Sequence, residues 1–142
     1  MFDLPHLHPM VVHFPIVLIM VGFLADILSL LFKKEKCLST MGFYLEILGV
    51  LATIFTVGTG YFLTSPMDGE AGALREQHEL FAFLTLGTII VAAFFRILLV
   101  YLKKEETKLK YVALGIFFLS FIFVTITGHL GGTLVFEYLV GI

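Results

Sequence analysis

Charged residues are scarce in this sequence of 142 residues. Asp, Glu, Lys and Arg make up 14% of the chain, against about 25% in soluble domains. Hydrophobic residues make up 59%, and the mean hydropathy is +1.04. The net charge is −2, and no basic patch is interleaved with aromatic residues. The composition is therefore not that of a soluble domain, and it gives no support for nucleic-acid binding.

The sequence also has little of what thiol redox sites and hydrolases need. Cys37 is the one cysteine, so neither an internal disulfide nor a Cys-x-x-Cys pair can form. There is no Gly-x-Ser-x-Gly motif, no Ser-His-Asp spacing and no phosphate-binding glycine loop, and GHLGG at 128–132 is too short to hold a nucleotide. These absences favour an electron-transfer or binding protein over a stand-alone enzyme.

Long apolar runs, in contrast, dominate the sequence. A membrane-spanning helix needs about 20 apolar residues, and the runs predict helices over about 10–32, 41–63, 78–102 and 109–128, with a glycine break at 128–132 that leads into an apolar tail at 129–142. The first run has no basic segment before it and no cleavage site after it, so we expect a retained helix and not a signal peptide. Pro15 should bend this helix near Val11, because proline cannot donate the next hydrogen bond.

The segments between these runs are short, which forces neighbouring helices to be antiparallel. We therefore predict one domain over 1–142, an all-α integral membrane protein with an up-down-up-down four-helix transmembrane bundle. The lysines all lie at the first and third connections, at positions 33, 34, 36, 103, 104, 108 and 110. Only Arg75 lies at the other end outside the apolar runs. The positive-inside rule then places both termini outside a bacterial cytoplasmic membrane.

All five histidines fall at the predicted outer end of the bundle. His6, His8 and His13 belong to the start of the first helix, His78 opens the third, and His129 follows the fourth. Neutral imidazole is a common ligand of iron, copper and zinc. Imidazoles from three helices therefore predict a metal or haem site.

Our preferred interpretation is haem b with His13 and His78 as axial ligands. His8 is the first substitute, and His129 is a further candidate as a ligand, as a partner of a propionate or as an interfacial residue. Two axial histidines favour electron transfer. A macrocycle could lie against a small-residue stripe on the second helix, although such stripes also let membrane helices pack closely: Gly49, Ala52, Thr53, Thr56 and Gly60.

Two alternatives remain open. One is a divalent-metal (zinc, copper or iron) binding or transport protein that uses the outer histidines and carboxylates, although their spacing matches no known metal motif: Asp3, His6, His8, Asp68, Glu70, Glu76, His78 and Glu79. The other is an accessory subunit of a respiratory complex, with histidines that only occupy the interface. His8 could then simply cap the first helix.

Three charged residues lie deeper, inside the apolar runs. Asp26, Glu46 and Arg96 are each about six residues from the inner end of their helix, which is ~9 Å at 1.5 Å per residue. Charges in a membrane are costly unless they are paired. We therefore predict an Asp26–Arg96–Glu46 network that connects three helices, with a proton path as the functional alternative.

Two segments of the sequence are similar to motifs of a known family, namely HPMVVHFPI near the start and GHLGGTLVFEYLVGI at the end. They resemble a family of small bacterial four-helix membrane proteins, described only as a domain of unknown function and sometimes fused to Rieske-type or cytochrome c modules. The resemblance covers essentially the whole chain. His78 matches the histidine that tends to open the third helix of the family, whereas the position of His129 often holds an aromatic residue. The matching motif positions are His8, Pro9, His13, Pro15, Gly131, Gly132, Leu134, Val135 and Tyr138.

Fusion to redox modules implies electron transfer for such proteins. We accordingly expect a relay near the outer membrane face, with a quinol or a periplasmic cytochrome c as partner, surrounded by membrane lipid. No inner histidine exists to hold a second haem, so one haem could not carry electrons across the bilayer alone. A homo-oligomer or a larger redox complex is therefore expected.

Overall fold

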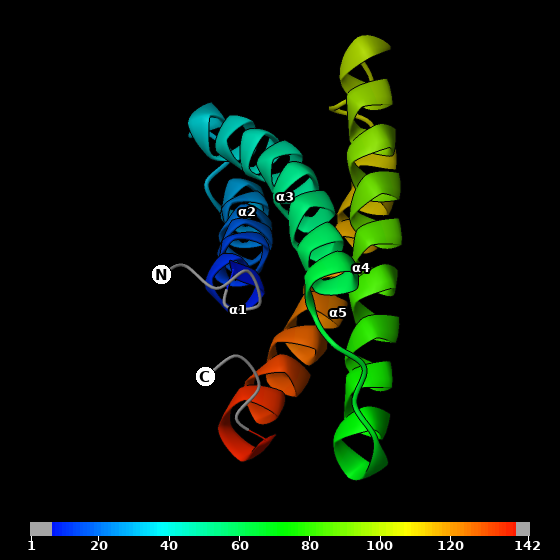
Figure 1. Ribbon diagram of the computed structural model, residues 1–142. Coiled ribbons are helices and arrows are strands. Elements are labelled where there is room, and N and C mark those ends of the chain that lie inside the picture. Colours follow the sequence, from blue (N-terminus) through cyan, green and yellow to red (C-terminus); the bar gives the residue numbers. More distant parts are fainter. Residues whose placement is uncertain (1–6, 139–142) are drawn as a thin grey trace.

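The computed structural model describes residues 7–138, which form a bundle of long antiparallel helices (Figure 1). The helices are α1 (Leu7–Val11), α2 (His13–Leu31), α3 (Lys36–Leu63), α4 (Gly69–Tyr101) and α5 (Leu109–Tyr138). With α1 and α2 taken together, the described residues contain four helical spans that are long and apolar enough to cross a membrane. The predicted all-α, four-helix membrane fold is confirmed. Asp3 and His6, named above as candidate ligands, and positions 139–142 of the predicted tail lie outside the described residues.

The first span is interrupted at Val12, between α1 and α2. Pro15 has no N–H, so the carbonyl of Val11 lacks its usual helical donor. The hydroxyl of Thr56 on α3 donates to this carbonyl at 3.4 Å. The interruption therefore falls where the sequence predicts a bend, and a threonine of the neighbouring helix replaces the lost donor.

Three spans begin earlier than hydropathy predicts, and the first of them begins at Leu7 and not at residue 10. Helix α3 begins at Lys36 and not near 41, and α4 begins at Gly69 and not at 78. Hydropathy marks only the apolar part of a helix, whereas segment 71–77, AGALREQ, is polar but rich in strong helix formers. His78 therefore lies in the third turn of α4, where the helix on both sides fixes its direction.

The predicted glycine break at 128–132 is wrong, because α5 continues through GHLGG to Tyr138. In a membrane a break would leave backbone groups without water or protein partners, so an unbroken helix is strongly favoured. Gly128 also has a packing role. A Cβ at this position would lie 3.1 Å from Cδ1 of Ile16 on α2. The glycines thus let α5 approach its neighbours without interrupting it.

The core of the bundle combines a few large side chains with small ones. Ile19, Ile89, Ala92, Phe117 and Val124 form the buried cluster. The tightest helix pairs are α2 with α3 and α4 with α5. At Gly49, part of the predicted small-residue stripe, a Cβ would lie 3.2 Å from Cγ1 of Ile19. This part of the stripe therefore serves close helix packing.

Large apolar side chains cover the outside of the bundle. Exposed examples occur on every span: Phe14, Leu24, Phe55, Phe62, Phe94 and Phe118. A water-exposed surface of this kind would drive aggregation. It suits contact with lipid tails, in agreement with the confirmed membrane fold.

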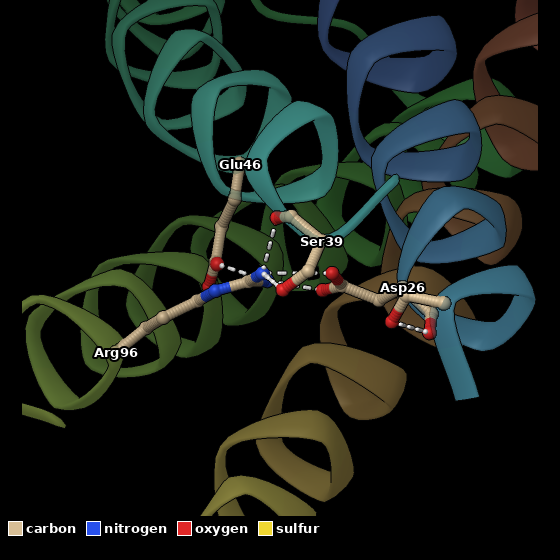
Figure 2. A network of polar contacts seen from close by, with 5 residues as sticks. Asp26, Ser39, Glu46 and Arg96 are labelled. Carbon is tan, nitrogen blue, oxygen red and sulfur yellow. Dashed lines mark hydrogen bonds and ion pairs between the residues drawn. The ribbon is translucent and has the colours of Figure 1, made fainter. Parts of the chain in front are cut away.

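The three deep charges meet at the end of the bundle that carries the lysine loops (Figure 2). Nη1 of Arg96 contacts Oδ2 of Asp26, and Nη2 donates to Oδ1 of Asp26 at 2.8 Å. Nη1 also donates to Oε2 of Glu46 at 3.3 Å, and Nη2 to the carbonyl of Ser39 at 2.8 Å. One guanidinium on α4 therefore binds both α2 and α3.

Gly42 on α3 makes room for this network, because a Cβ there would overlap Oδ1 of Asp26. We predict that Gly42→Ala lowers the free energy of unfolding by about 1–3 kcal/mol, since the carboxylate must leave its bidentate position on Arg96. Gly58→Ala in the same helix is the matched control. Within residues 7–138, no neighbouring side chain lies within 4 Å of its added methyl group, so it should gain about 0.5–1 kcal/mol from helix propensity. Thermal and denaturant unfolding in detergent checks both values, and equal shifts in the two variants would contradict the packing role of Gly42.

Candidate functional site

A cavity of about 670 Å³ lies at the opposite end of the bundle, where the first span begins and α3 ends. All four spans contribute to its walls. Most of the lining surface is apolar and a smaller part is polar, which is the usual composition of a small-molecule site. The residues that line the cavity include His8, Pro15, Ile16, Thr53, Thr56, Arg75, His78, Thr85, Val124, Thr127, Gly131 and Leu134. The histidine end of the molecule therefore contains a large cavity, whereas the cavity beside the charge network at the lysine end has a volume of only about 80 Å³.

Two histidine rings lie close to each other at this cavity, in a T-shaped arrangement. The ring centroids of His8 and His78 are 6.2 Å apart, and the ring planes are inclined by 80°. Both residues are half-buried. The pair joins α1 to α4, so each ring is held by a different span.

One ring nitrogen of His78, Nδ1, forms a hydrogen bond to the backbone. Nδ1 lies 3.0 Å from the carbonyl oxygen of Thr127 on α5. A carbonyl can only accept, so Nδ1 carries the proton and donates. The lone pair of the neutral ring is then on Nε2, which is the arrangement found in histidines that bind metals.

The ring of His8 is fixed in the same way by a hydroxyl group. Nδ1 lies 3.1 Å from Oγ1 of Thr59 on α3. The hydroxyl proton of Thr59 is already donated to the carbonyl of Thr56 at 2.8 Å, so Oγ1 must accept from Nδ1 of His8. His8 therefore also has its proton on Nδ1 and a lone pair on Nε2.

Each ring also lies against a glycine. A Cβ at Gly60 would lie 2.8 Å from Cε1 of His8, and a Cβ at Gly131 would lie 3.0 Å from Cε1 of His78. Any side chain at either position would force the ring to move. Gly60 belongs to the predicted small-residue stripe and Gly131 to GHLGG, so these glycines provide space for the two imidazoles.

The remaining candidate ligands have different environments. His13 lines the same cavity but is exposed, and the ring that faces His78 belongs to His8. His129 is exposed and is not part of the cavity lining. Asp68, Glu70 and Glu76 are exposed at or near the start of α4. Within residues 7–138, no group of three or more His, Cys, Asp or Glu side chains is arranged to hold a metal ion.

Sequence reasoning missed three residues that shape this site. Thr59 and Thr127 orient the two rings, and Arg75 brings a positive charge to the cavity, where its Nη2 donates to Oγ1 of Thr64 at 3.3 Å. Thr56, Thr59 and Thr53 recur at helical spacing along α3, so a polar stripe facing the histidines was visible in the sequence. The partnership of Thr127 with His78 was not visible, because it uses a backbone carbonyl.

Comparison with protein families matches residues 5–142 to the family described as "Predicted membrane protein (DUF2231)". Comparisons with curated proteins and with solved structures give no match.

We predict that His8 and His78 both carry their proton on Nδ1 in the ligand-free protein, because the carbonyl of Thr127 can only accept and the hydroxyl proton of Thr59 is directed to the carbonyl of Thr56. Long-range ¹H–¹⁵N spectra of histidine-labelled protein in detergent, at a pH where the rings are neutral, report the tautomer of each ring. Thr59→Val removes the acceptor of His8 and should change the spectrum of His8 while that of His78 stays the same. A proton on Nε2 of either ring in the wild-type protein would contradict the assignment.

Proposed function

This chain belongs to the DUF2231 family of predicted membrane proteins, and we propose that it is a b-type cytochrome that binds one haem between His8 and His78. The observation that carries the proposal is the pair of imidazoles with oriented, unprotonated Nε2 atoms beside one apolar cavity. When bound, the haem would supply one-electron transfer. Two axial histidines leave no open position on the iron, which suits that chemistry.

The spacing of the two rings supports this pairing. A metal with an imidazole nitrogen at about 2 Å on either side places the ring centroids about 6 Å apart, and the observed separation is 6.2 Å.

The number of ligands favours haem over a bare metal ion. Structural zinc sites take four protein ligands and catalytic ones take three, whereas the described residues bring no third His, Cys, Asp or Glu side chain to the pair. A porphyrin supplies four nitrogens of its own, so two histidines complete the coordination of its iron. Zinc or copper binding is therefore the weaker alternative for this cavity.

The rest of the cavity suits an amphiphilic macrocycle. Ile16, Val124 and Leu134 would contact its apolar edge and exclude water, and Arg75 would pair with a carboxylate such as a propionate. The hydrogen bonds from the two histidines to Thr59 and Thr127 fix the ring orientation and raise the basicity of Nε2. His13, the preferred ligand from the sequence, lines the same cavity and is the alternative to His8 in this proposal.

The site lies at one end of the bundle, opposite the lysine loops. By the positive-inside rule this is the outer face of a bacterial cytoplasmic membrane, with both termini outside. The partner would be a quinol or a periplasmic cytochrome c, and the protein would act as a relay or as a subunit of a larger redox complex. An accessory subunit without haem is the alternative that the next measurement tests.

We predict that the protein purified from cells supplied with haem has a Soret band that shifts on reduction with dithionite, together with sharp α and β bands. His8→Ala and His78→Ala should each abolish these bands, because each removes one axial ligand. His13→Ala is the matched control and should keep them. A colourless wild-type protein would refute haem binding, and loss of the bands in His13→Ala but not in His8→Ala would overturn the choice of ligand.

We also predict that Gly60→Ala and Gly131→Ala weaken haem binding by about tenfold or more, as happens when the groups that support a metal ligand are displaced. Each added methyl group would push one imidazole out of position. Gly132→Ala is the control, since Gly132 lines the cavity but an added Cβ meets no neighbouring atom within 4 Å in the described part of the chain. Haem titration of the purified variants gives the affinities, and equal losses in all three would contradict the role of the two glycines.

A further inference from the structure

The charge network at the lysine end contains more negative than positive charge. Arg96 is always protonated, and it contacts two carboxyl groups, those of Asp26 and Glu46. If both acids were ionised, the network would carry one net negative charge inside the apolar part of the bundle. Uncompensated charges at such positions are costly. The network is electrically neutral only when one of the two acids holds a proton.

The two acids are bound unequally. Asp26 receives both terminal nitrogens of Arg96, whereas Glu46 has one contact, at 3.3 Å. The remaining donor capacity of Nη2 goes to the carbonyl of Ser39. Glu46 is also the more deeply buried acid, with 1% of its surface exposed against 6% for Asp26. The bidentate geometry suits an ionised Asp26, so the proton belongs on Glu46.

A small cavity beside the network provides a route for this proton. It has a volume of about 80 Å³, and a water molecule occupies about 30 Å³ in the liquid, so it has room for water. The groups that line it come from all four spans and from the α4–α5 connection: Asp26, Ser29, Ser39, Glu46, Arg96, Glu105, Lys110 and Tyr111. Glu105 is exposed and Lys110 is half-buried, so the cavity extends from Glu46 to the surface at the lysine loops.

We propose that Glu46 is a reversible proton-binding site inside the bundle, connected through this cavity to the lysine end. In the neutral network Glu46 is a carboxylic acid. On deprotonation its O–H bond breaks, the proton passes to water in the cavity and then to the aqueous phase, and the carboxylate remains beside Arg96. This proposal rests on the charge network alone and does not require haem at the other end.

Infrared spectroscopy of the full-length protein in detergent tests the proposal, because a protonated carboxylic acid has a carbonyl stretch separate from the amide bands. At neutral pH the wild-type protein should show one buried acid band that moves on exchange into D₂O and disappears reversibly as the pH is raised. Glu46→Gln should remove the band. The exposed Glu35→Gln, at the residue directly before the same helix, is the matched control and should keep it.

Asp26→Asn separates this proposal from a purely structural role. With the competing carboxylate neutralised, Arg96 is left to Glu46, which should then ionise, so the band should be lost at neutral pH although Glu46 is still present. Circular dichroism confirms that each variant is folded. The proposal is overturned if the folded wild-type protein has no acid band at neutral pH, if the band survives Glu46→Gln, or if it does not respond to pH.

Discussion

Polar groups in a lipid-embedded bundle can be satisfied only by one another, and this constraint organises the whole molecule. Hydrocarbon supplies no hydrogen-bond partner, so each buried donor and acceptor must meet a protein group or enclosed water. No buried side-chain nitrogen or oxygen in residues 7–138 lacks a partner. Thr53, Thr88 and Thr125 bond back to their own helices. The polar groups that reach across helices are concentrated at the two ends.

The two ends of the bundle satisfy their buried polar groups in different ways, and the cavity at the histidine end is much larger than the cavity at the lysine end. At the lysine end, Arg96 draws α2 and α3 against α4, and the space left is small. At the histidine end, Thr59 and Thr127 hold the imidazoles at the walls, so a large cavity stays between the spans. Glycine permits both arrangements, since Gly42 admits the carboxylate of Asp26 and Gly60 admits the ring of His8. Glycine therefore makes room for the charge network at one end of the bundle and for an imidazole beside the large cavity at the other.

Much of this architecture can be predicted from the sequence. Apolar runs identify the four spans, and the short connections give their antiparallel order. The similar distances of Asp26, Glu46 and Arg96 from the inner ends of their helices predict that these three residues meet. The helix ends cannot be predicted in this way, because hydropathy reports lipid contact and not backbone hydrogen bonding. The segment AGALREQ is helical although it is polar, and GHLGG is helical although it is rich in glycine.

The first helix begins at Leu7 and not at the predicted residue 10. This difference also explains why the pairing of His8 with His78 was difficult to predict. A helix beginning at residue 10 would leave His8 in a terminal segment, whereas α1 begins at Leu7 and gives His8 a defined direction. The span is interrupted at Val12, between His8 and His13, so helical spacing does not give the relative direction of the two rings. Thr59 on α3 accepts a hydrogen bond from His8, and this contact between two spans selects which of them faces His78. The spacing of these residues in the sequence does not reveal this contact between His8 and Thr59.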